Sequence, residues 1–121
     1  MRNRKLGKLG EEEAEKFLKK KGLKSVGKNF HCRWGEIDLV MKDGKTLVFV
    51  EVKTRSNASF GTPEEAVNQP KLSKLLKSAY AYLEQNGIET QDFRLDAVAI
   101  EIQDQKVVRI SHIPNLSVDT F

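Results

Sequence analysis

Apolar side chains recur with a helical period in two segments of the chain. The first spans residues 9–21, and its apolar stripe consists of Leu9, Ala14, Phe17 and Leu18. Glutamates cluster in its first turn and lysines in its last, which complements the helix dipole, and Gly22 is a typical helix stop. The second segment spans residues 71–86, and its stripe consists of Leu72, Leu75, Leu76, Ala79 and Leu83. We therefore expect two amphipathic helices.

Other apolar runs have the length and composition of strands, and they span residues 24–33, 35–41, 46–54, 93–102 and 106–113. Asp43-Gly44 is a strong signal for a two-residue hairpin turn between the second and third runs. Thr62-Pro63-Glu64-Glu65 is typical of a helix start, but Pro70 should interrupt that segment before the main helix. The order αβββαββ predicts an α/β fold with a mixed central sheet and helices packed on its faces.

Charged side chains gather in the predicted hairpin of residues 35–54. With the Asp-Gly turn, Glu36 would lie directly opposite Glu51, and Asp38 would be a diagonal neighbour of Glu51. Because side chains alternate along strands, one face would carry Glu36, Asp38, Glu51 and Lys53. Carboxylates on a covered strand need a cation or several hydrogen bonds, and Mg²⁺ or Mn²⁺ would suit these hard oxygen ligands. The alternative is a solvated face with ordinary ion pairs, which explains three acids on one face less well.

Two strings in this hairpin resemble the PD-(D/E)xK nuclease superfamily: Gly-Glu-Ile-Asp-Leu-Val at 35–40 and Val-Phe-Val-Glu-Val-Lys-Thr-Arg at 48–55. In that superfamily an aspartate on one strand joins an acid-x-Lys triplet on the next, and the matching residues are Asp38, Glu51 and Lys53. The whole string is similar to the YraN-like (UPF0102) family of uncharacterised bacterial proteins, which is usually described as Holliday-junction-resolvase-like. The similarity extends to Gly10-Glu11, Phe60-Gly61, Arg94-Leu95-Asp96 and His112-Ile113-Pro114-Asn115.

This resemblance implies a single domain over residues 1–121 with a restriction-endonuclease-like three-layer αβα fold. It also implies a metal-dependent endonuclease that acts on DNA, including branched or single-stranded DNA. The implied ligands of Mg²⁺ or Mn²⁺ are Asp38, Glu51, Glu11 and the carbonyl group of Val52. Lys53 would orient the attacking water and stabilise negative charge. The groups expected to contact nucleic acid are Arg33, Arg55 and Lys71. Glu36 would act on the site through its neighbours.

An alternative function is a nucleic-acid-binding module that keeps this fold without catalysis. Resolvase-like enzymes act as dimers on two strands, so a homodimer is a further expectation of the resemblance. The charge distribution agrees with a polyanionic partner. Residues 1–34 contain 11 lysines and arginines against 4 acids, a net charge of +7, and residues 35–121 contain 10 against 13, a net charge of −3. We expect DNA rather than RNA, although the sequence does not distinguish them.

Apolar runs nowhere approach the ~18 residues that cross a bilayer, so we expect no membrane partner. Cys32 is the single cysteine and can form no internal disulfide, which favours a cytoplasmic protein, and we expect it to be a small buried hydrophobe. Trp34 should anchor the core or a loop, with stacking on a base as the alternative. His31 and His112 should have surface or strand roles. Asp96 lies in an apolar run and should pair with a basic residue.

Overall fold

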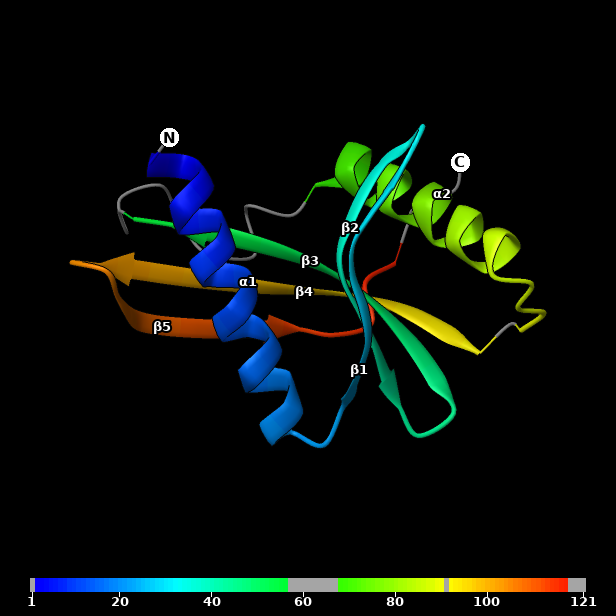
Figure 1. Cartoon of the computed structure of the whole chain (residues 1–121), viewed down its shortest axis with the longest axis horizontal. Coiled ribbons are helices and arrows are strands. Elements are labelled where there is room, and N and C mark those ends of the chain that lie inside the picture. The colour runs from blue at the N-terminus through cyan, green and yellow to red at the C-terminus, as the bar shows by residue number, and fades with distance from the viewer. Residues whose placement is uncertain (1, 57–67, 91, 118–121) are drawn as a thin grey trace.

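The structure is a computed structural model, and it describes residues 2–56, 68–90 and 92–117. Its elements are α1 (Arg2–Lys20), β1 (Lys24–Cys32), β2 (Gly35–Asp43), β3 (Thr46–Arg55), α2 (Gln69–Gln85), β4 (Phe93–Gln103) and β5 (Lys106–Ile113). This order confirms the predicted αβββαββ arrangement (Figure 1). The predicted helix start at residues 62–65 lies outside the described residues.

The strands form one mixed sheet with the spatial order β1-β2-β3-β4-β5. Neighbouring strands are antiparallel except for β3 and β4, which are parallel. Helix α2 lies in the crossover that this parallel pair requires. The predicted mixed sheet is therefore confirmed, and its central strand β3 has no exposed residue.

The two helices cover opposite faces of the sheet and make three layers. The stripe of α1 buries Ala14 and Leu18 against Leu39, Val50 and other apolar residues of the central strands. The stripe of α2 buries its own apolar residues, Leu75, Ala79 and Leu83, against the other face, where Val40 and Phe49 lie. Each fully buried leucine of this kind contributes about 1.5–3 kcal/mol through removal of apolar surface from water. In the described part of the chain, neither helix is long and apolar enough to span a membrane.

Both helices differ from their predicted limits at the N-terminal end. Helix α1 starts at Arg2 instead of residue 9, because Leu6 and Leu9 extend the apolar stripe by a further turn. Helix α2 starts at Gln69, and Pro70 does not interrupt it. Pro70 occupies the first turn, where a backbone N–H has no partner within the helix, and the Asn68 side chain caps that turn by accepting from the N–H of Lys71.

The β2–β3 register differs by two residues from the predicted one. Asp43 pairs with Thr46, so the two loop residues are Gly44 and Lys45, and Leu39 pairs with Val50. Asp43 is the last residue of β2, and its carboxylate accepts a 3.0 Å hydrogen bond from Arg94 of β4, a tertiary contact that local turn propensity does not include. The predicted pairing of Glu36 with Glu51 was therefore wrong. Glu36 instead lies across from His31 of β1, 3.2 Å from its Nδ1.

Candidate active site

The candidate site lies where β2 and β3 separate. Their pairing ends at Leu39 and Val50, and at the same place the alternation of side chains in β2 is broken. Ile37 packs into the cluster under α2, whereas Leu39 packs into the cluster under α1, although residues two apart on a regular strand face the same side. Asn29, in the stretch of β1 that faces Asp38, has a φ of 54°. The prediction that Glu36, Asp38, Glu51 and Lys53 share one face assumed regular alternation, and this break makes that assumption wrong.

Asp38 is held in the gap between the two strands. Its side chain is buried, with the residue 6% exposed, and its Oδ2 accepts a 2.7 Å hydrogen bond from the backbone N–H of Val52 on β3. Burial raises the pKa of Asp38 to about 7, and the carboxylates of Glu51, Glu11 and Glu36 add to the effect, while the Val52 N–H opposes it. Asp38 is thus a buried acid surrounded by other acids.

Glu11 reaches the same gap from α1. Gly10, the residue before it, brings this turn of the helix so close to β3 that a Cβ atom at that position would overlap the Thr54 hydroxyl oxygen. The carboxyl group of Glu11 is in hydrogen-bonding contact with that of Asp38. Burial raises the pKa of Glu11, and the charge of Glu36 raises it further. Two carboxyl groups in contact therefore share a proton at neutral pH or repel each other.

Lys53 supplies the positive charge beside these acids. Its Nζ lies 3.1 Å from Glu51 Oε2, and both side chains are about three-quarters buried. The Lys53 amine also contacts that of Lys71 at the start of α2. This contact lowers the pKa of Lys71. Burial opposes the charge of Lys53, but the contact with Lys71 and the attraction of Glu51 outweigh it and raise the pKa of Lys53. The Lys53 ammonium is therefore held beside Glu51 in the folded chain.

The other predicted site residues lie at different distances from the acids. The N–H of Val52 faces Asp38, and in an extended strand the carbonyl of the same residue points to the same side. Arg55 ends β3 and is partly buried, and its charge acts on Lys71. Arg33 lies apart from them, in the turn between β1 and β2. Lys71 and Arg55 are therefore placed near the acids, and Arg33 is not.

The donor chemistry of Glu11, Asp38 and Glu51 fits a hard divalent cation, since all three offer carboxylate oxygens that repel one another. Their spacing is not yet that of a ligand set. Within residues 2–56, 68–90 and 92–117, no three acidic, histidine or cysteine side chains are grouped closely enough to hold a metal ion as they stand. Asp38 is engaged with Val52, and Glu51 with Lys53. A cation here would have to compete with the Lys53 ammonium and with the proton on Asp38.

The sequence of this chain is similar to those of a known protein family, and the similarity includes the residues of the candidate site. The model of Uncharacterised protein family UPF0102 matches residues 10–100, which include Glu11, Asp38, Glu51 and Lys53. This chain belongs to that family. A UPF0102 protein of Syntrophomonas wolfei is 46% identical over 113 residues, which cover 93% of this chain and 97% of that protein. A UPF0102 protein of Carboxydothermus hydrogenoformans is 42% identical over 116 residues, covering 96% and 98% of the two chains.

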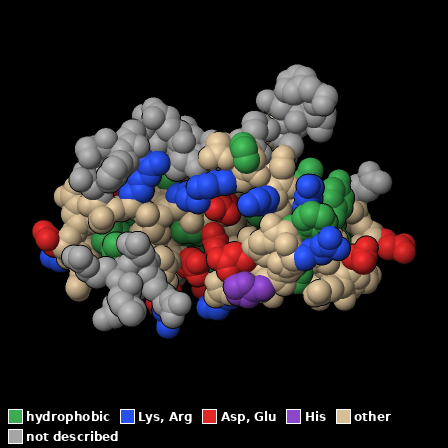
Figure 2. All heavy atoms as spheres, turned by 90° about the horizontal axis from the view of Figure 1, so that it is seen from above, with side chains coloured by type: hydrophobic (Ala, Val, Ile, Leu, Met, Phe, Trp, Pro, Cys, Tyr) green, Lys and Arg blue, Asp and Glu red, His purple; other side chains and the backbone are tan. Residues whose placement is uncertain are grey.

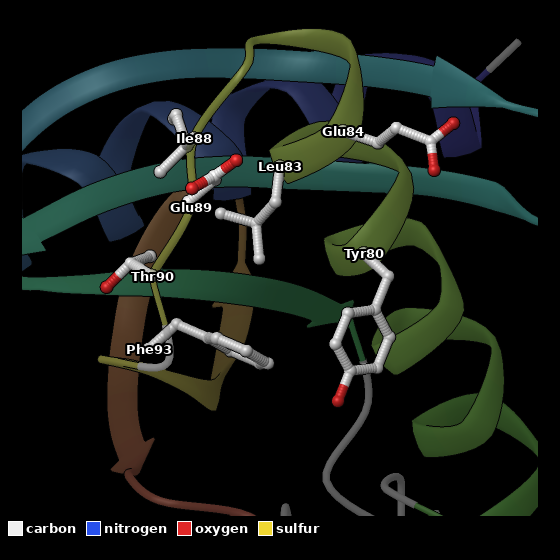
Figure 3. Close-up of a pocket in the computed structure, with 7 residues that line it drawn as sticks. All are labelled: Tyr80, Leu83, Glu84, Ile88, Glu89, Thr90 and Phe93. Atoms are coloured by element: carbon white, nitrogen blue, oxygen red, sulfur yellow. The ribbon is translucent and has the colours of Figure 1, made fainter.

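One hollow of this UPF0102 member has Glu11, Asp38 and Glu51 outside its lining. It has a volume of about 750 Å³ and is lined by Tyr80, Leu83, Glu84, Ile88, Glu89, Thr90 and Phe93 (Figure 3). Tyr80 and Leu83 come from α2, and the other side of the hollow comes from the segment before β4.

Sequence reasoning missed a second polar cluster around Asp96, which is completely buried on β4. Asp96 accepts from Arg94 Nε at 3.1 Å and from the Asn115 N–H at 2.9 Å, and its Oδ2 lies 2.8 Å from His112 Nε2. Lys21 Nζ lies 2.7 Å from Nδ1 of the same imidazole. Because an ammonium group can only donate, Nδ1 accepts and Nε2 donates to Asp96. The predicted pairing of Asp96 with a basic residue is thus confirmed.

Among the expectations for isolated side chains, the one for Cys32 was wrong. The side chain of His112 is only 6% exposed and lies on β5, which agrees with the expected strand role. Cys32 is only partly buried, with its Sγ 3.4 Å from Ser78 Oγ. Trp34 is 38% exposed in the β1–β2 turn and belongs to neither buried core. The signal for the Asp96 cluster was an acid in an apolar strand together with the family-like motifs at residues 94–96 and 112–115, which lie outside the candidate site.

Proposed function

We propose that this chain is a metal-dependent endonuclease that hydrolyses phosphodiester bonds in DNA. The observation that carries the proposal is the convergence of Glu11, Asp38 and Glu51, from α1, β2 and β3, beside the Lys53 ammonium. A buried acid whose pKa is raised by burial and by other carboxylates is unfavourable in a purely structural role. Such strain is typical of a site that awaits a cation.

The proposed metal is Mg²⁺ or Mn²⁺, held by Asp38 and Glu51, with Glu11 and the Val52 carbonyl as further ligands. When bound, it would polarise the scissile phosphate and acidify a water molecule. Asp38 would lose its shared proton on binding, and Glu51 would exchange part of its contact with Lys53 for the ion. Lys53 would then be free to hold the attacking water and to stabilise the negative charge of the transition state.

Basic groups next to the acids would position the polymer. Lys71 lies against Lys53, and Arg55 lies close enough to act on Lys71, so both are near the phosphates that flank a scissile bond. The lowered pKa of Lys71 reflects its contact with Lys53, and a phosphate between the two amines would remove that conflict. Lys53, Lys71 and Arg55 thus place positive charge beside the acid cluster, which suits a polyanion that crosses it.

The alternative is a nucleic-acid-binding module without catalysis. One observation favours it: no three ligand groups are arranged for a metal among the described residues. Against it, simple binding does not require a buried acid next to two others, since those acids repel phosphates. Calorimetric titration with Mn²⁺ separates the two functions. The nuclease should bind the ion and release protons near pH 6, whereas a module of the second kind should bind DNA and take up no metal.

The deciding experiment is a nicking assay on four-way junction, flap and single-stranded DNA, with Mg²⁺, with Mn²⁺ and with EDTA. An RNA strand of the same sequence tests the choice of polymer. Asp38→Ala should abolish cleavage. The matched control is Lys45→Ala, which changes an exposed residue in the β2–β3 turn at the other end of the hairpin. Cleavage that persists in Asp38→Ala would identify a contaminating nuclease and overturn the proposal.

A further inference from the structure

Trp34 is exposed at the β1–β2 turn and carries cations against its ring. The guanidinium carbon of Arg33 lies 4.6 Å from the centre of the indole ring, and Lys77 Nζ lies 4.8 Å from it. Both cations are on exposed residues, so both side chains can move away when a ligand arrives. Cation–π contacts of this kind are individually weak, about 0.5–1 kcal/mol at exposed positions. The indole face is therefore covered by groups that are easily displaced.

A hollow of about 570 Å³ lies directly beside this indole. It is lined by Cys32, Arg33, Trp34, Lys77, Tyr80, Ala81, Glu84 and Gln85. Two of its aromatic side chains are open to solvent, since Trp34 is 38% exposed and Tyr80 is 57% exposed. Exposed aromatic rings next to mobile cations form the combination that holds bases and phosphates of unpaired nucleic acid.

A row of lysines connects this hollow with the acid cluster. Lys71, Lys74 and Lys77 recur every three residues on α2, and all three are exposed. The row covers about 9 Å of the helix axis. Lys71 contacts Lys53 in the candidate active site, and Lys77 contacts Trp34. On the face shown in Figure 2, lysine and arginine side chains lie beside the acidic ones, which agrees with a basic path that leads away from the acids.

We propose that this row and hollow bind an unpaired strand of nucleic acid, with one base stacked on Trp34 and its phosphates on Lys74 and Lys77. The inference rests on the proposed function and narrows its substrate to DNA in which some bases are unpaired, because a paired base cannot present its face to the indole. The lysines would hold any strand, but only an unpaired base would displace Arg33 or Lys77 from the ring.

Acidic residues limit how far a strand could continue along α2 beyond the row of lysines. Glu84 lines both the hollow beside Trp34 and the hollow of Figure 3, where Glu89 is a second acid, and both carboxylates repel phosphates. A strand that follows the lysine row would therefore turn outward near Tyr80. An acidic protein segment could use the same lysines, but it has no flat aromatic face to stack on Trp34 and so would leave the ring largely unchanged.

Trp34 is the single tryptophan of the chain, so its fluorescence reports on this surface alone. The probes are a thymidine oligonucleotide, an abasic oligonucleotide of equal length and polyglutamate, each titrated without metal. We expect strong quenching by the thymidine strand and little by the other two, because only the first offers bases. Equal quenching by all three would show that charge alone acts on the ring, and the stacking would be refuted.

Affinity measurements on variants complete the test. Trp34→Ala should weaken binding of the thymidine strand about 5- to 150-fold, and Trp34→Phe should keep most of the affinity, because stacking needs only an aromatic face. Lys77→Ala should reduce the slope of log K against log salt by about 0.7, the share of one phosphate contact on a single strand. Lys45→Ala serves as the control for loss of an exposed lysine.

The two proposals fail separately in these experiments. Unchanged affinity in Trp34→Ala, with cleavage retained by the wild type, would overturn the stacking site and leave the nuclease standing. Binding and quenching that are intact in a protein with no metal-dependent cleavage of any substrate would overturn the nuclease alone. Failure of the wild type to bind any oligonucleotide would end both.

Discussion

Asp38 Oδ2 accepts a 2.7 Å hydrogen bond from the Val52 N–H, and this bond fixes the position of an acid that burial makes difficult to ionise. The ordinary pKa of the group is 3.8, and in the folded chain it is about 7. The folded state therefore holds its proton more tightly than the unfolded state does. The contribution of Asp38 to stability is fully present below about pH 4 and is lost as the pH rises through 7, by as much as about 4 kcal/mol.

The first prediction follows from this pH dependence. In EDTA, Asp38→Asn should raise the free energy of unfolding at pH 8 and have little effect at pH 4, because asparagine cannot ionise. Urea denaturation at both pH values measures the difference. Asp104→Asn, the same change at an exposed turn residue, should have little effect at either pH. A wild-type protein whose stability does not fall between pH 4 and 8 would contradict the raised pKa.

The close approach of Gly10 to Thr54 gives a second prediction. Gly10→Ala should push α1 away from β3, lower stability by about 1–3 kcal/mol and displace Glu11 from Asp38. Gly7→Ala is the matched control on the same helix, where nothing lies within 4 Å of a new Cβ atom, and it should stabilise the protein by about 0.5–1 kcal/mol. Thr54→Ala should rescue part of the loss in Gly10→Ala, as a double-mutant cycle would show.

The third prediction concerns the buried network around Asp96. Asp96→Asn should cost about 3–5 kcal/mol, because Arg94 and His112 would lose their buried anion. Asp43→Asn removes a 49% exposed partner of the same arginine and should cost less than about 1 kcal/mol. Similar losses in both variants, measured by chemical denaturation, would argue against the network as a unit.

The same network predicts sensitivity to strong acid. Burial would raise the pKa of Asp96, but hydrogen bonds from His112, the Asn115 N–H and Arg94 outweigh it and lower that pKa. The ionised group therefore stabilises the fold above about pH 3.8, and this stabilisation is lost as the pH falls through the lowered value. Acid unfolding followed by circular dichroism should be shallower in Asp96→Asn than in the wild type.

The fourth prediction separates metal binding from catalysis. Lys53→Met should leave Glu51 without its ammonium partner at 3.1 Å, so Mn²⁺ should bind more tightly. Cleavage should nevertheless fall by about 10²–10³-fold, since the charge that stabilises the transition state is gone. Calorimetry and the nicking assay measure the two effects. A variant that lost metal affinity and activity together would assign Lys53 a structural role instead.

The identity of the elements was predictable from the sequence, and their detailed placement was not. Periodicity placed both helices and all five strands, because each buries one recurrent apolar set. The register of the hairpin was mispredicted because the contact of Asp43 with Arg94 is non-local. The start of α2 was predicted two residues late, because the Asn68 side chain caps the first turn and thereby places Pro70 inside the helix.

The candidate site shows the same division. The spacing of Asp38, Glu51 and Lys53 in the sequence was enough to propose them as residues of one candidate site. Their predicted arrangement was based on regular alternation of side chains along β2, which fails at Asp38. Trp34 was expected to anchor the core or a loop, and the structure places it in the β1–β2 turn, 38% exposed and outside both buried clusters. The imidazole of His112 meets Asp96 only through the pairing of β4 with β5, a relation that no local pattern contains.

The two outer strands of the sheet have a consequence for self-association. Strands β1 and β5 leave one edge unpaired each, and such edges invite pairing with another molecule. The basic residues of these two strands are Lys24, Lys28, Lys106 and Arg109, and neither strand contains an aspartate or a glutamate. Pairing of these edge strands between two copies would bring like charges together, and this repulsion disfavours growth of the sheet into a fibre.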